Sequence, residues 1–230
     1  MPSFEFLCLA NSKKLSHRCI AGLRTDTGEW IRPVSSSLHG ELTHSQRNLG
    51  TAGDPQNFDT LRVSFANHAP TASQPENWLI DGTAWQLVSR PAPTRLHTVL
   101  GGAIHGSAKL FGSLSDHIPE ATFSSHPAKE SLALVKPAGL RWLTDSYGPH
   151  KKARALFSTA GAAYNLAVTD PIYQSRIKSL QLGYHKSTEL GIEDEERILF
   201  TISLGEPFEG NCYKLVAAVL MLPVGWPSIR

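Results

Sequence analysis

The residues best suited to chemistry in this chain are a group of cations and one indole near the N-terminus. Lys13, Lys14 and Arg18 lie in or beside a short polar loop between two apolar, strand-like segments. A third such segment carries Trp30 and Arg32, which are two residues apart and therefore share one face of a strand. Because cations hold phosphates and an indole face stacks a base, this set predicts a nucleic-acid-binding surface. The alternative interpretation places Trp30 in the core, covered by the stem of Arg32.

A second set of cations and aromatic residues lies in the C-terminal half. Its members are Arg141, Trp142, Lys151, Lys152, Arg154 and Tyr164. Lys152 and Arg154 share a face of one predicted strand, and Tyr164 lies on the predicted hairpin partner of that strand. Cations interleaved with aromatic rings are typical of a path for single-stranded nucleic acid. The competing explanation is a solvated strand edge that lysines keep soluble.

The histidine-containing motifs identify no catalytic or metal site. His39-Gly40-Glu41 matches the start of the zinc deaminase signature, but the P-C-x-x-C that completes it is absent. His185 and Asp170 are of types that pair for base catalysis, yet no serine or cysteine stands in a nucleophile motif. Phosphate-binding glycine loops are also absent. We therefore assign no catalytic residue, metal or cofactor. The alternative is a metal- or histidine-dependent enzyme that acts on nucleic acid or nucleotides and is centred on the loop with His39 and His44.

The composition is that of a folded, mildly basic protein. Hydrophobic residues make up 41% of the 230 residues, and the formal net charge is +2, so a nucleic-acid contact must use a local patch. Cys8, Cys19 and Cys212 form no C-x-x-C pair, which favours buried reduced thiols in a reducing cytoplasm. The N-terminus lacks the regions of a signal peptide, and the longest apolar run, residues 215–224, is too short to span a membrane. We expect a cytoplasmic protein with no membrane contact.

The hydrophobic pattern predicts strands in both halves of the chain. The weakly patterned segment 106–129 separates them and is interpreted as a linker. Residues 35–57 show no sustained period and are predicted as a long loop with room for one short helix. A short helix is predicted over residues 93–103. A further helix is predicted to start at Pro171, with Asp170 as its N-cap.

The order of the elements predicts the fold. Five short strands, with one helix before the last two, give the second half the order of an OB-type barrel. The first half has a similar number of strands, but its predicted helix falls late, near residue 95. We expect a mostly β protein with two small OB-like β-barrels in tandem and one or two short helices. The barrels are predicted over residues 1–105 and 130–230.

Several short stretches resemble a known family, the dual OB-containing domain proteins of bacteria and archaea. The matching stretches are residues 9–13, 18–22, 30–34, 168–171, 202–206 and 213–215. The resemblance implies two small β-barrels in tandem and a role in binding nucleic acid or a nucleotide. It implies no catalytic residue. Asn11, Lys13, Trp30 and Arg32 lie inside the matching stretches and are the binding residues that the resemblance suggests.

The sequence therefore predicts a non-catalytic module that binds nucleic acid or a nucleotide through basic and aromatic strand faces. A second alternative is a protein–protein adaptor subunit of a bacterial complex, which would bind its partner through the exposed edges of the barrels. The mild net charge is compatible with such an adaptor.

Overall fold

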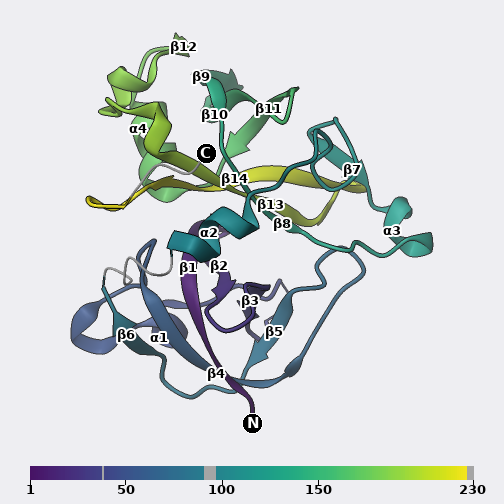
Figure 1. The fold of residues 1–230 in the computed structure, drawn as a ribbon. Helices are drawn as coiled ribbons and strands as arrows, with labels where there is room; N and C mark the ends of the chain where they lie inside the picture. Colours follow the sequence, from purple (N-terminus) through teal and green to yellow (C-terminus); the bar gives the residue numbers. More distant parts are fainter. Residues whose placement is uncertain (38, 91–96, 227–230) are drawn as a thin grey trace.

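The computed structural model describes residues 1–37, 39–90 and 97–226, and its strands form two sheets, one above the other in Figure 1. The strands of the first sheet are β1 (Ser3–Lys14), β2 (His17–Arg24), β3 (Trp30–Val34), β4 (Thr60–His68), β5 (Asn77–Ile80) and β6 (Gln86–Ser89). They pair in the order β1-β2-β3-β5-β4-β6, and β1 also pairs with β4, which closes a five-stranded barrel. Strands β3 and β5 are parallel, and the other pairs are antiparallel. This is the strand order of an OB-type barrel.

The second sheet repeats this order. Its strands are β7 (His117–Pro119), β8 (Leu132–Val135), β9 (Ala138–Tyr147), β10 (His150–Thr159), β11 (Ala162–Val168), β12 (Gly183–His185), β13 (Ile198–Phe208) and β14 (Asn211–Met221). The central order is β9-β10-β11-β14-β13-β8, with β11 parallel to β14. Only residues 136 and 137 separate β8 from β9, so these two strands act as one bent strand that pairs with β13 at one end and with β10 at the other. Both barrels of the predicted fold are therefore present.

Each barrel has a helix between its third and fourth principal strands. Helix α1 (His44–Arg47) and the 3₁₀ turn Gly50–Ala52 lie between β3 and β4, inside the predicted long loop. Helix α4 (Pro171–Ser179) follows β11, and the Asp170 side chain accepts hydrogen bonds from the Ile172 and Tyr173 backbone N–H groups, as the sequence predicted. The late helix predicted in the first half corresponds to α2 (His97–Ala103). The start of that prediction, residues 93–96, lies outside the described residues.

The remaining short elements lie between or beside the barrels. They are α3 (Ala121–Ser125) and the 3₁₀ turns Ser187–Leu190 and Glu195–Arg197. The segment 106–129 contains β7 and α3, and β7 pairs with β14. The division of the chain at this segment stays a prediction. In the described part of the chain, no helix is long and apolar enough to cross a membrane.

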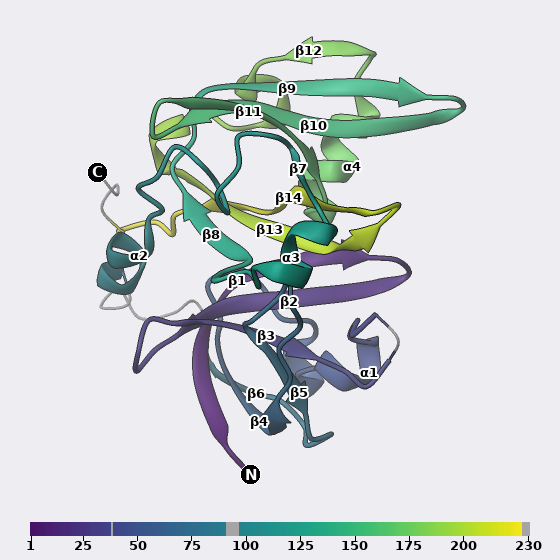
Figure 2. The same ribbon diagram turned by 90° about the vertical axis from the view of Figure 1, so that its right-hand side faces the viewer.

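An apolar layer joins the two barrels. Strand β1 is buried on both faces: Phe6 and Cys8 point into the first barrel, whereas Leu7 and Leu9 pack against residues of β8, β13 and β14. Figure 2 shows β1 and β2 directly below β13 and β14. The Leu9 carbonyl also accepts a hydrogen bond from the buried Thr201 hydroxyl. The alternation of β1 therefore separates two cores, and the β1–β2 hairpin is held against the second barrel.

Candidate nucleic-acid interface

Two of the predicted binding residues, Lys13 and Arg18, line a basic groove of about 690 Å³ where the barrels meet. The residues that line this basic groove are Lys13, Ser16, His17, Arg18, Arg47, Pro171, Gln174, Ser175, Lys178 and Ser179. One wall is the β1–β2 hairpin with Arg47 of α1, and the other is α4 of the second barrel. Five of the lining residues are basic and none is acidic.

A backbone hydrogen bond joins the two walls of the basic groove. Lys13 and Arg18 are cross-strand partners in the β1–β2 hairpin, so their side chains are neighbours on one face. The Lys13 N–H donates to the Thr169 carbonyl over 2.9 Å, which joins the hairpin to the second barrel just before α4. Asp170 then caps α4, and its other carboxylate oxygen accepts from the Val219 N–H of β14. The groove is thus fixed by the same residues that start the helix.

The charge of the basic groove is only partly compensated. Arg47 is buried, and its guanidinium donates to Asp54 over 3.1 Å. Burial lowers the pKa of Arg47, Asp54 opposes this, and the nearby cation of Arg18 lowers the pKa further. The ion pairs found among the described residues do not include Lys13, His17, Arg18 or Lys178. Cations without carboxylate partners on both walls favour an anionic ligand.

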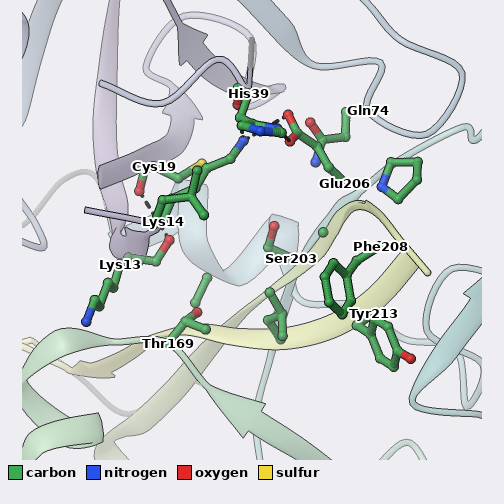
Figure 3. Close-up of a pocket in the computed structure, with 16 residues that line it drawn as sticks. Lys13, Lys14, Cys19, His39, Gln74, Thr169, Ser203, Glu206, Phe208 and Tyr213 are labelled. Atoms are coloured by element: carbon green, nitrogen blue, oxygen red, sulfur yellow. Dashed lines mark hydrogen bonds and ion pairs between the residues drawn. The ribbon is translucent and has the colours of Figure 1, made fainter. Parts of the chain in front are cut away.

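A second hollow, which we call the inter-barrel cleft, adjoins the groove and has a volume of about 390 Å³ (Figure 3). It lies between the β1–β2 hairpin and the β13–β14 hairpin, and Lys13 lines both hollows. The predicted binding residue Lys14 lies here. Its ammonium donates to Glu206 over 2.9 Å and to the His39 carbonyl. The His39 imidazole lies 3.3 Å from the other carboxylate oxygen of Glu206. These contacts tie the two barrels together at the rim of the cleft.

Arg32 was predicted as a surface residue, but it is 1% exposed. The pairing of β3 with β5 turns its side chain into the junction of the barrels, where it donates to Asn77 Oδ1 over 3.3 Å and to Ser203 Oγ over 3.2 Å. Its Nε has no partner. Ser203 also lines the inter-barrel cleft, so this guanidinium lies directly behind the cleft wall.

The other N-terminal candidates have structural contacts. Asn11 donates from Nδ2 to the Pro55 carbonyl over 2.7 Å, which ties β1 to the segment before β4. Trp30 is half-buried and packs against the apolar layer between the barrels, in agreement with its alternative interpretation as a core residue. Neither residue lines the basic groove or the cleft. The shared face of Trp30 and Arg32 therefore packs against the second barrel and is not a binding surface.

The second predicted cluster does not form one surface. Tyr164 is 5% exposed, and its hydroxyl donates to the Ala108 carbonyl, so the predicted stacking role is corrected to a core role. Arg154 donates to the side chain and carbonyl of Asn165. Lys151 donates to the Leu180 carbonyl, and Lys152 lies 4.3 Å from the centre of the Tyr147 ring. Trp142, the indole of this cluster, is also fully buried. Arg141 lines a separate hollow with the acidic run Glu193–Glu196. An acidic neighbourhood of that kind repels phosphates.

The histidines of the long loop lie apart from each other. His39 contacts Glu206, whereas His44 lies 3.0 Å from Asp54. Within residues 1–37, 39–90 and 97–226, no group of three or more His, Cys, Asp or Glu residues is arranged to hold a metal ion. His185 contacts Glu189 rather than Asp170.

Sequence reasoning did not assign Arg47 or Lys178 to a site. Arg47 lies in the loop without a periodic pattern, and Lys178 lies near the end of α4, far from Lys13 in the chain. Only the packing of the second barrel on the β1–β2 hairpin brings them together. The one local signal was the Asp170-Pro171 helix start, which predicts α4 but not its neighbour.

Of the comparisons with known proteins, the one with family models agrees with this fold. No curated protein and no solved structure matches the chain significantly. OB-type barrels are a common scaffold of binding modules, with ligands held by loops between strands. The family described as the dual OB-containing domain matches residues 4–219, nearly the whole chain, and the protein therefore belongs to this family.

Proposed function

We propose that the protein binds single-stranded nucleic acid, with the sugar–phosphate backbone in the basic groove. The observation that carries this proposal is the groove itself: five basic residues line it, with no acidic residue among them. Lys13 and Arg18 on the hairpin face Lys178 on α4, so a chain of phosphates between them meets cations on both walls. Such contacts act on the backbone and carry no sequence information.

The expected affinity depends steeply on salt. Each phosphate contact with a single strand contributes roughly −0.7 to the slope of log K against log salt. Contacts from Lys13, Arg18 and Lys178 would together give a slope of about −2. Anisotropy titrations of fluorescent DNA and RNA single strands over a range of salt concentrations measure this slope.

Paired variants locate the interface. The double variant Lys13→Ala/Arg18→Ala removes two cations of the groove and is expected to bring the slope to roughly −0.7 and weaken binding. The matched control is Lys109→Ala/Lys129→Ala, which makes the same charge change at two exposed lysines that do not line the groove. The control should bind like the wild type. Binding that is absent, insensitive to salt, or reduced equally by both double variants would contradict the proposal.

A further inference from the structure

The inter-barrel cleft differs chemically from the groove beside it. Its wall is mainly apolar and includes Leu15, Phe208, Leu215 and Ala217, whereas Lys14, His39 and Glu206 line its rim. Its volume of about 390 Å³ lies within the range of small-ligand pockets, ~300–1,000 Å³. A flat ring with a few polar edges fits this lining better than a phosphate does.

Large apolar side chains are exposed at the cleft. Leu15 is 62% exposed and Phe208 is 63% exposed, and each lies on a different barrel. Leu15 also has a φ of 52°, a left-handed conformation in which glycine or asparagine is favoured over leucine. Neither side chain is held by burial. Local stability therefore does not explain a bulky leucine at this turn position, whereas contact with a ligand in the cleft would explain it.

The cleft also has a cation behind its wall. The Arg32 guanidinium is buried, and its two hydrogen-bond partners, Asn77 and Ser203, are neutral. No carboxylate lies within ion-pair distance of it among the described residues. Buried charges are normally paired, so a cation with neutral partners next to a cleft attracts carbonyl oxygens or negative charge into it.

The groove and the cleft are joined at Lys13, which lines both. Figure 3 shows the Lys13 ammonium directed away from Lys14 and Glu206. A phosphate at Lys13 would place its own nucleotide at the entrance of the cleft. The charge of the ligand and its ring would then meet complementary surfaces at the same time.

We propose that the inter-barrel cleft receives one base of the bound strand and that this base stacks on Phe208. Leu15 closes the opposite side of the base. The inference rests on the proposed function, because the backbone in the basic groove delivers the base. It adds that the protein recognises nucleobases as well as phosphates.

An abasic strand separates the two proposals. An oligothymidylate and an abasic strand of the same length carry the same phosphates, so the groove alone binds them equally. If the cleft holds a base, the wild type should prefer the oligothymidylate by roughly 5- to 150-fold, the range for stacking one base on an aromatic side chain. Equal binding of the two strands overturns the cleft inference and leaves the proposed function intact. Binding of neither strand overturns both.

Matched variants place the preference in the cleft. Phe208→Ala should abolish the preference for the oligothymidylate and leave abasic binding unchanged, because Phe208 is mostly exposed and contributes little to folding. Tyr184→Ala, which truncates an equally exposed aromatic residue on β12, is the control and should keep the preference. A preference that survives Phe208→Ala contradicts the assignment.

Two further measurements report on the same cleft. Leu15→Asn suits the left-handed backbone, so the variant should fold at least as stably as the wild type while its preference for the oligothymidylate decreases. Cys19 lines the cleft and is half-buried. Saturating oligothymidylate should slow alkylation of Cys19, and an abasic strand should not. Equal alkylation rates with both strands bound would contradict a base in the cleft.

Discussion

Replacement of Arg32 by methionine should leave the fold intact or make it more stable. Arg32 is 1% exposed at the junction of the barrels, and its guanidinium has only neutral partners. Methionine replaces the aliphatic stem of arginine and carries no charge, but it leaves the buried Asn77 Oδ1 without the donor that Arg32 supplies. The variant therefore removes a buried charge without removing much packing.

The expected magnitude follows from the contacts that are lost. The two hydrogen bonds, at 3.3 and 3.2 Å, are long, and the third donor, Nε, has no partner. Hydrogen bonds that involve a charged group contribute ~1.5–3 kcal/mol each, and the long distances put these at the lower end. The cost of desolvating one ion is several kcal/mol. We expect the free energy of unfolding of Arg32→Met to lie between unchanged and about 2 kcal/mol above that of the wild type.

Arg47→Met is the matched comparison. Arg47 is also buried, at 7% exposed, but it donates to the Asp54 carboxylate over 3.1 Å. Its loss leaves this partly exposed carboxylate with His44 as its remaining side-chain partner. This variant should lose about 1–2 kcal/mol of stability. Urea unfolding followed by tryptophan fluorescence measures both variants. If Arg32→Met is destabilised as much as Arg47→Met, Arg32 stabilises the junction, and our account of it as an uncompensated cation next to the cleft is refuted.

The remaining predictions concern the capping residue of α4 and a buried thiol. Asp170→Ala should lower the free energy of unfolding by about 2–4 kcal/mol, because it removes the N-cap and leaves the buried Val219 N–H without an acceptor. Asp170→Asn, which keeps one acceptor oxygen, should lose less, and equal losses in urea unfolding would contradict this. Burial raises the pKa of Cys8 from 9.0 to about 12, so above pH 9 the unfolded chain releases a proton that the folded chain keeps. The free energy of unfolding of the wild type should therefore fall, relative to that of Cys8→Ala, by up to about 1.4 kcal/mol per pH unit above pH 9. If the difference in unfolding free energy between the two proteins does not change with pH, Cys8 ionises in the folded state and the prediction is wrong.

The sequence predicted those parts of the fold that depend on local patterns. The hydrophobic pattern of the strand segments and the helix start at Asp170-Pro171 have local causes, and the structure confirms strands in both halves of the chain and the N-cap of α4. The order of the elements predicted an OB-type barrel in the second half, because few topologies accommodate five short strands with a helix before the last two. In the first half the predicted helix fell late, and the helix that completes the same order is α1, inside the predicted long loop.

The candidate site was only partly predictable, because alternation gives the face that two residues share but not the direction of that face. Trp30 and Arg32 do lie on adjacent outward positions of β3, yet the second barrel covers that face. Lys13 and Arg18 stay accessible because they lie at the end of the hairpin, beyond the apolar layer. Residues from α1 and α4 complete the groove, and no local pattern links them to the hairpin.

The position of both hollows at the junction couples binding to the packing of the barrels. Lys13 is joined to Thr169, Lys14 to Glu206 and Arg32 to Ser203, so each wall is placed by a contact between barrels. A single barrel has one wall of the groove and one wall of the cleft. Since a ligand that contacts both walls binds only the docked arrangement, it stabilises that arrangement by its own binding free energy. Leu9 lines neither hollow, so a substitution that weakens the apolar layer around it should reduce affinity only through the junction, just as the ligand stabilises the junction by binding.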